Sequence, residues 1–183
     1  PGPRVDRSIV ADLVVPALPA ATGPHGLTGL ALSPDGRRMA TARGAVAEIR
    51  EEGGHVTVLD GLPRRVDALH FSADGSRLVV AGGTPGLSGV AAGYDRAIKL
   101  WNADTGALLH AIDVHTGAVF DLAWHPSGKV LASASADETV KLWRAADGLR
   151  LDTLKEPQGE VRAVLFTPDG RHVIAAGRDR ALV

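Results

Sequence analysis

Apolar residues of this chain occur in short runs at alternating or near-alternating positions, and turns rich in Pro, Asp and Gly separate the runs. A period of two is typical of β-strands, because successive side chains of a strand point to opposite faces of a sheet. The runs do not follow the period of an amphipathic helix. The pattern therefore predicts an all-β protein.

The strands belong to repeated units. Two segments, VAAGYDRAIKLW at 90–101 and ASASADETVKLW at 132–143, align without gaps over one Asp and a Lys-Leu-Trp ending, and their tryptophans are 42 residues apart. A turn marker that follows an apolar run occurs four times, as LALSPDG, LHFSADG, LAWHPSG and VLFTPDG. The intervals between the final glycines of these markers are 39, 53 and 42 residues. A period near 40 indicates a repeat protein, and the alternating pattern places short strands in each unit.

The family resemblance described in the next paragraph implies four strands, a to d, in each unit. The predicted bounds are 27–32, 38–42, 45–50 and 55–59 in unit one; 66–71, 77–81, 97–101 and 107–112 in unit two; 119–124, 130–134, 139–143 and 149–154 in unit three; and 161–166, 172–176 and a strand from 180 in unit four. Unit four lacks a strand d within the chain. Ile9 to Val15 are the candidate for that strand.

These features resemble the WD-repeat family of β-propellers: the period, a V-x-x-V-x-F strand, a Pro-Asp-Gly turn and a final Lys-Leu-Trp. The resemblance covers residues 23–183. It implies about four four-stranded blades, at 23–61, 62–113, 114–155 and 156–183, which form a partial ring or half of a larger one. Residues 1–22 would form an N-terminal segment that supplies the closing outer strand. A GGTPG stretch at 82–86 resembles bacterial members.

The chain departs from the family pattern in two units. Ile49 stands where unit one should have its Trp, and the chain stops two residues before the Trp of unit four. Because the chain starts at Pro1 and stops at Val183 within a predicted strand, we expect a fragment, a processed product or an engineered chain.

Unit two carries about eleven residues too many for the repeat. Both LVVAGG at 78–83 and VAAG at 90–93 align with strand b. Residues 84–92 are therefore either a loop insertion or the scar of a lost blade, where the front of one repeat was fused to the back of the next. Because loops tolerate insertions at low cost, both interpretations stay open.

Composition narrows the possible partners. Twenty Lys and Arg stand against twenty-one Asp and Glu, for a net charge of -1, so we expect neither a nucleic-acid nor a membrane partner. The chain has no Cys, which excludes disulfides and thiolate metal sites. The apolar stretch from Ser8 is interrupted by Asp12 and two prolines, so it is too short and broken for a membrane span.

One Ser, one His and one Asp of unit three raise the question of catalysis. The resemblance instead implies a structural hydrogen-bond network of His115, Ser133, Asp137 and Trp143, with partial copies at Asp95 and Trp101 and at Asp179. We expect the structural role, because no oxyanion donors or substrate cleft can be identified. The other histidines lack metal-ligand spacing, so we expect no metal site and no cofactor. Because the Ser, His and Asp have a structural role, we also expect no enzyme activity.

The resemblance also implies where partners dock, on the rim formed by the d-to-a and b-to-c connections. Arginines and aromatic residues, which are enriched at binding hot spots, gather at these positions. The predicted rim residues are Arg65, Asp67, Tyr94, Phe120, Glu160, Arg162 and Arg178. The alternative is that Phe120 packs in a core and the charged residues are merely solvated.

The sequence thus predicts a scaffold that binds a protein partner, without catalysis. One alternative is a propeller enzyme, or a propeller that binds a metal or small ligand, with its site in the central channel. Another is a structural or designed oligomeric ring. The exposed faces of four blades in an open arc also favour a homodimer that closes an eight-bladed ring. Neither the partner's identity nor the compartment follows from the sequence.

Overall fold

The computed structural model describes residues 26–44, 46–59, 61–62, 66–82, 98–112, 115–155, 159–178 and 181–182. All regular structure in these ranges is β-strand, so none of them forms a helix that could span a membrane. The expected closing strand, Ile9 to Val15, lies outside the described residues, as does the segment 83–97 of unit two.

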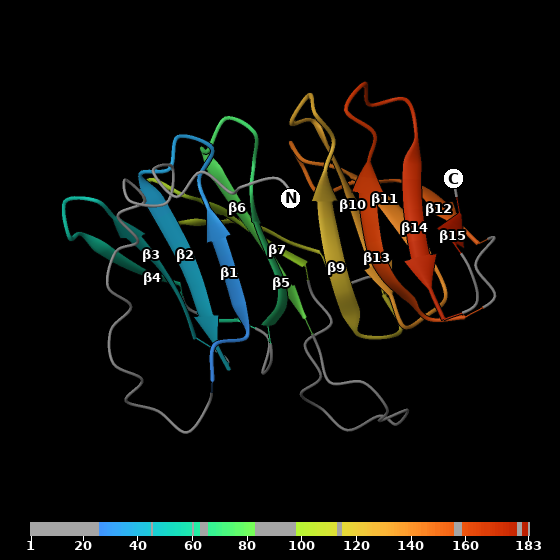
Figure 1. Cartoon of the computed structure of the whole chain (residues 1–183), viewed down its shortest axis with the longest axis horizontal. Coiled ribbons are helices and arrows are strands. Elements are labelled where there is room, and N and C mark those ends of the chain that lie inside the picture. The colour runs from blue at the N-terminus through green and yellow to red at the C-terminus, as the bar shows by residue number, and fades with distance from the viewer. Residues whose placement is uncertain are drawn as a thin grey trace, which may run out of the picture.

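The strands form four antiparallel sheets, each ordered as in the sequence (Figure 1). The first sheet contains β1 (Gly29–Leu32), β2 (Arg38–Arg43), β3 (Val46–Glu51) and β4 (Val56–Leu59). The second contains β5 (Val66–Phe71), β6 (Arg77–Gly82), β7 (Ile98–Asn102) and β8 (Leu108–Ile112). The third contains β9 (Val119–Trp124), β10 (Val130–Ser135), β11 (Val140–Arg144) and β12 (Arg150–Leu154). The fourth contains β13 (Val161–Phe166), β14 (Val173–Gly177) and β15 (Ala181–Leu182).

The all-β propeller fold is confirmed, with strand bounds that differ from the predicted ones by only one or two residues. The conflict in unit two is also resolved in part. β6, which contains the LVVAG residues, pairs with both β5 and β7 and so fills the place of strand b. The competing VAAG segment lies outside the described residues.

The turns after the inner strands β1, β5 and β13 share one hydrogen-bond pattern. In the first sheet the Ser33 hydroxyl donates to the Asp35 carboxylate at 2.5 Å and accepts from the backbone N–H of Arg38 at 2.9 Å. Gly36 ends the turn with a φ of 72°, a left-handed conformation that glycine adopts without strain. The same bonds recur at Ser72 and Asp74, and at Thr167 and Asp169. Local chemistry therefore sets the strand boundaries that the sequence pattern predicted.

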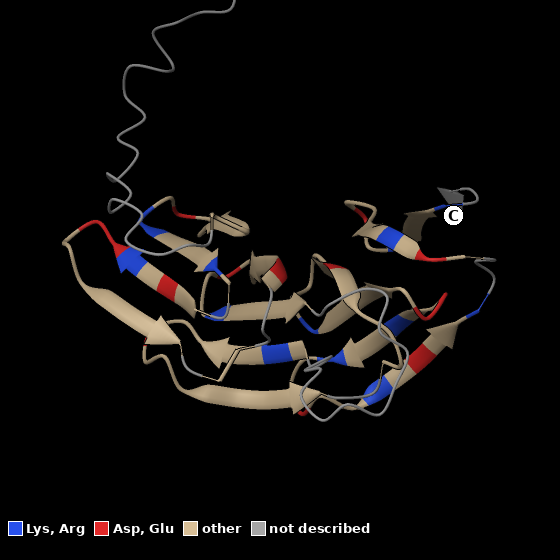
Figure 2. Cartoon of the chain, turned by 90° about the horizontal axis from the view of Figure 1, so that it is seen from below, with Lys and Arg blue, Asp and Glu red and all other residues tan. Residues whose placement is uncertain are grey.

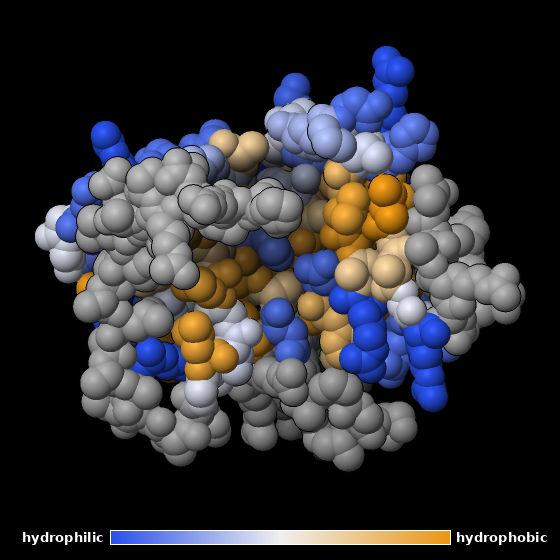
Figure 3. Space-filling model, viewed as in Figure 1, coloured by the Kyte–Doolittle hydropathy of each residue, from blue (hydrophilic) through white to orange (hydrophobic). Residues whose placement is uncertain are grey.

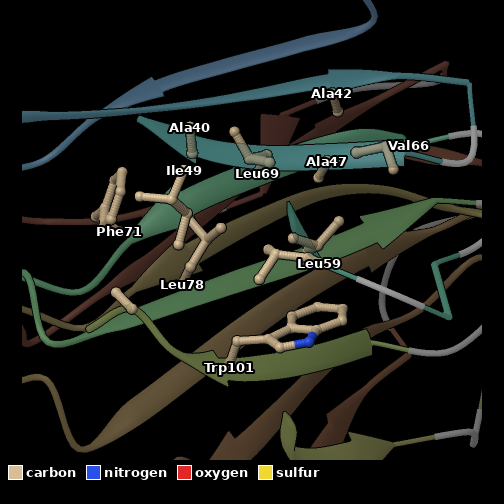
Figure 4. Close-up of a cluster of buried hydrophobic side chains, with 12 residues drawn as sticks. Ala40, Ala42, Ala47, Ile49, Leu59, Val66, Leu69, Phe71, Leu78 and Trp101 are labelled. Atoms are coloured by element: carbon tan, nitrogen blue, oxygen red, sulfur yellow. The ribbon is translucent and has the colours of Figure 1, made fainter. Parts of the chain in front are cut away.

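The sheets follow an open arc (Figure 2). The inner strands β1, β5, β9 and β13 lie next to one another on its concave side. Between adjacent sheets are three clusters of buried apolar side chains. Figure 4 shows the cluster between the first and second sheets, where Trp101 lies beside Leu59 and Leu78. Packing between neighbouring blades is thus the core of this fold.

Each sheet has two different faces. We call the face turned toward the preceding sheet the leading face and the opposite one the trailing face. In the first cluster the second sheet contributes its leading face, with Val66, Leu69, Phe71, Leu78, Val80 and Trp101. The first sheet contributes its trailing face, with Ala40, Ala42, Ala47, Ile49 and Leu59. Large leading side chains therefore pack on a trailing face rich in alanine.

The structure corrects the assignment of Ile49 to the Trp position. Trp101 pairs with Leu78 and Trp143 pairs with Leu131, but the residue paired with Met39 at the same place is Arg50. Ile49 points to the other face, into the core. The reason is a shorter turn: β2 and β3 are joined by residues 44–45 alone, whereas residues 136–139 join β10 and β11.

Side chains also join each sheet to a backbone carbonyl of the next. The Arg38 guanidinium donates to the carbonyl of Gly75 at 2.9 Å, and that of Arg77 to the carbonyl of Ala145 at 3.2 Å. His125 Nδ1 accepts from the N–H of Ser127, so Nε2 carries the proton and donates to the carbonyl of Gly170 at 3.0 Å. Each of the three boundaries between sheets thus has a hydrogen bond from a side chain to a backbone carbonyl, beside the apolar core. We call these contacts the polar seams.

Candidate functional site

The four network residues of unit three lie in one hydrogen-bonded chain. His115 precedes β9, Ser133 is on β10, Asp137 is in the β10–β11 turn and Trp143 is on β11. The indole N–H of Trp143 donates to Ser133 Oγ at 2.8 Å. Ser133 Oγ lies 2.7 Å from His115 Nε2, and His115 Nδ1 lies 2.8 Å from Asp137 Oδ2.

Burial of His115 determines which atoms donate and which accept in this hydrogen-bond network. Burial is the main cause that lowers the pKa of His115, although the hydrogen bond to Asp137 opposes it. The imidazole is therefore neutral at pH 7. Its Nδ1–H donates to the Asp137 carboxylate, and its Nε2 accepts from the hydroxyl of Ser133.

Asp137 is the most heavily bonded member. Its Oδ1 accepts from the Thr139 hydroxyl at 2.6 Å, and its Oδ2 accepts from the Thr116 N–H at 3.0 Å. Burial alone would raise the pKa of Asp137, but the hydrogen bonds from His115, Thr139 and Lys141 outweigh it and hold that pKa well below the usual range. The carboxylate is therefore ionised at neutral pH.

Lys141 is a fifth member that the sequence reasoning missed. Its ammonium donates to Asp137 Oδ2 at 3.0 Å, and the residue is only 6% exposed. A buried ammonium requires a partner of opposite charge, and here the carboxylate supplies it. The signal was present in the sequence, because Lys141 precedes Trp143 by two positions and so lies on the same face of its strand.

Unit two carries an apolar version of this arrangement. Trp101 is buried like Trp143, but Val80 takes the place of Ser133: Val80 pairs with Lys99 as Ser133 pairs with Lys141. Asp95 and Asp179, the other predicted partial copies, lie outside the described residues.

The geometry around Ser133 opposes a catalytic role for the Ser, His and Asp. A nucleophile must reach its substrate, and Ser133 is completely buried. In addition, no three His, Asp or Glu side chains in the described ranges lie close enough together to hold a metal ion. What this arrangement can do is fix the β10–β11 turn against the start of β9.

The network should make stability depend on pH. Because the pKa of His115 is lowered in the folded chain, the unfolded chain binds the proton first as the pH falls below the ordinary histidine value of 6.5. We therefore expect the free energy of unfolding to decrease between about pH 7 and pH 5. Denaturant titrations across this range should show a weaker pH dependence for His115→Asn than for the wild type. Equal pH dependence in both proteins would contradict the neutral buried imidazole.

The predicted rim residues occupy a special place in their strands. Asp67, Phe120 and Arg162 each follow the first Val of an inner strand, where the pairing of that strand shifts by one residue. Such a β-bulge re-aims the extra side chain. The three positions are therefore structurally equivalent along the rim.

Phe120, Glu160 and Arg162 come together across the boundary of the third and fourth sheets. The Arg162 guanidinium lies 4.8 Å from the centre of the Phe120 ring and donates to the Glu160 carboxylate at 2.6 Å. The backbone N–H of Arg178 donates to the carbonyl of Glu160 at 3.1 Å. Phe120 is half-buried rather than a core residue, and the Arg162 side chain is 60% exposed.

The other predicted rim residues are not in this group. Asp67 is half-buried on β5, in the second sheet. Arg65 and Tyr94 lie outside the described residues. We call Phe120, Glu160, Arg162 and Arg178 the rim cluster.

Asp121 supports the rim cluster and was missed by the sequence reasoning. Its carboxylate accepts from the backbone N–H of Val164 at 2.9 Å, which ties β9 to β13 directly beneath the cluster. Its Oδ1 also lies 3.6 Å from Nε2 of His70 on β5. The only signal in the sequence is an Asp where the units on either side have Ala68 and Ala163.

Two segments of the chain match a known family of repeats. Residues 106–144 and 148–183 each match the family model described as WD40: WD domain, G-beta repeat. A comparison with curated protein sequences found no significant match. Each matched segment begins with the outermost strand of one sheet and continues through the first three strands of the next. These matches identify WD repeats at residues 106–144 and 148–183, and the antiparallel sheets arranged in an arc around their inner strands agree with such repeats.

Proposed function

We propose that the chain is a protein-interaction scaffold without catalytic activity, and that partners dock on its rim cluster. WD repeats typically mediate protein–protein contacts, which supports the scaffold role. The observation that carries the docking surface is the stacking of the exposed Arg162 guanidinium on the Phe120 ring. Arg and aromatic residues dominate the binding energy of many protein interfaces.

The rim cluster suits a mixed ligand. The Phe120 ring offers apolar area, and the guanidinium that covers it stays available for a carboxylate. Arg178 adds a second exposed cation close by, because its backbone is bonded to Glu160. We therefore propose a partner segment with an acidic side chain next to an apolar one. Arg65 and Tyr94, from the predicted rim, would extend the surface.

The network of unit three has a supporting role in this proposal. It holds the β10–β11 turn, whose Ala136 N–H donates to the carbonyl of Ala118 at 2.9 Å, two residues before Phe120. The buried Ser, His and Asp thereby act on the rim through the backbone and not through chemistry.

The docking surface can be tested with a triple variant, F120A/R162A/R178A. We expect it to lose the proteins that the wild type captures from a lysate of the source organism, measured by quantitative mass spectrometry. The control is K129A/L149A/R171A, which also removes two cations and one apolar side chain, all three exposed. It should retain capture. Circular dichroism must show both variants folded; unchanged capture by the folded rim variant would rule out this surface.

Self-association, the other partner relation expected from the sequence, would use a different surface. The rim cluster lies at the inner strands, whereas a second copy that completes the ring would meet the two end faces of the arc. The two relations can therefore be tested separately.

A further inference from the structure

The arc leaves one face of each terminal sheet without a neighbouring sheet among the described residues. On the first sheet this is the leading face. Leu30 and Leu32 of β1 lie on it, opposite Thr41 and Met39 of β2. Met39 is buried, but Leu30, Leu32, Val46 and Val58 on the same face are all about half exposed.

On the fourth sheet the trailing face is the uncovered one. Leu165 pairs with Ile174 and Ala163 with Ala176, so all four side chains share this face. Leu165 is 50% exposed, and both alanines are exposed. Figure 3, which looks onto the concave side, shows hydrophobic atoms gathered over β13 and β14.

The internal boundaries show what such faces bind. In each of the three core clusters a leading face packs on a trailing face, and two leading faces never meet. Leu30 and Leu32 hold the positions of Leu69 and Phe71 in the second sheet, counted from the turn glycines. By the same count Leu165 holds the position of Ala31, which packs on the first cluster. The two end faces are therefore of complementary kinds.

The charges at the outer ends of these faces are complementary as well. Inside the chain, Arg38 lies two residues after its turn glycine and pairs at 2.6 Å with Asp104, in the β7–β8 turn of the next sheet. In the fourth sheet the equivalent position is His172, with Arg171 beside it. In the first sheet the part that would face them is the end of β3 and the β3–β4 turn, which carry Glu51 and Glu52.

We infer that the trailing face of the fourth sheet packs on the leading face of the first sheet of a second copy, and vice versa, so that two chains close an eight-bladed ring. Each copy offers one face of each kind, so a two-fold pair covers both ends at once. Eight blades lie within the range known for propellers. The inference does not depend on the rim cluster.

The boundary between copies should be weaker than those within a chain. Arg50, paired with Glu48 at 2.7 Å, stands on the first sheet's leading face where the second and third sheets present a tryptophan. An ion pair in place of an indole gives this boundary less apolar area. The pair should therefore dissociate on dilution.

Light scattering after size exclusion, over a range of concentrations, tests the pairing. We expect a mass near twice 18.9 kDa at high concentration and 18.9 kDa after dilution. A monodisperse monomer at every concentration would overturn the inference. So would masses that grow without limit, because head-to-tail contacts that do not close form open chains of copies.

Substitutions identify the faces. L165D and L32K should each reduce the mass to that of the monomer, and the double variant L165D/L32K should restore the dimer, because the new Asp of each copy meets the new Lys of the other. L108D, at an exposed leucine of outer strand β8, is the control and should remain dimeric. A dimer that survives both single substitutions, or a double variant that stays monomeric while circular dichroism shows it folded, would contradict the assigned faces. The F120A/R162A/R178A variant should still form the dimer, which separates this test from that of the docking surface.

Discussion

Replacement of Asp137 by alanine should lower the free energy of unfolding by about 3–5 kcal/mol, the cost of removing one partner of a buried ion pair. The substitution leaves the Lys141 ammonium buried without its carboxylate and takes the acceptor from His115 Nδ1. It also removes the bonds that hold Thr116 and Thr139 to the turn.

Asp147→Ala is the matched control, because Asp147 belongs to the same sheet and also pairs with a cation, Arg144, at 2.8 Å. Since that pair is exposed and screened by solvent, its loss should cost much less. Denaturant titrations followed by tryptophan fluorescence would measure both variants. Asp179→Ala is a second comparison, because the sequence gives unit four an incomplete set; it too should cost less. Equal losses of unfolding free energy for the Asp137 and Asp147 variants would mean that the buried network stabilises the fold no more than an exposed ion pair does.

Trp101→Ala should also cost about 3–5 kcal/mol, but for a different reason, the cavity left by a large core side chain. Trp101 is 1% exposed and lies in the cluster that joins the first two sheets. Since Val80 stands where unit three has Ser133, the indole is held there mainly by packing. Trp101→Phe, which keeps most of the volume, should lose much less.

Trp124→Ala provides the comparison for this substitution. Trp124 is only partly buried at the next cluster, and its indole N–H makes a long bond of 3.4 Å to the carbonyl of His70. Thermal unfolding of the three variants should rank Trp101→Ala as the least stable. If Trp124→Ala were equally damaging, blade-to-blade packing at Trp101 would not be the main source of stability.

Strands and turns could be predicted from the sequence because their causes are local. Each inner strand is followed directly by a Ser, Thr or His whose side chain bonds within the turn, and then by a left-handed glycine such as Gly36 or Gly75. Repetition of that turn gave the spacing of the units, and alternation gave the strands between them. The family resemblance gave the four members of the network in unit three.

Features that depend on pairing between strands could not be predicted. The bulges that present Phe120 and Arg162 add one residue to a strand, and the sequence carries no mark of which residue is extra. The short β2–β3 turn put Arg50, and not Ile49, in the Trp position. Contacts between sheets, such as that of Asp121 with the N–H of Val164, join residues 43 positions apart.

The polar seams between sheets have an evolutionary consequence. Arg38, Arg77 and His125 all donate to main-chain carbonyls, and two of the acceptors, Gly75 and Gly170, are the left-handed turn glycines that recur in every unit. A hydrogen bond of this kind relies on the turn backbone that the units share and not on a polar side chain particular to one neighbour. Recombination that duplicates, exchanges or removes whole units can therefore preserve these seams, provided that the apolar side chains at the new boundary also fit. A gene built from such units can change its length by entire blades.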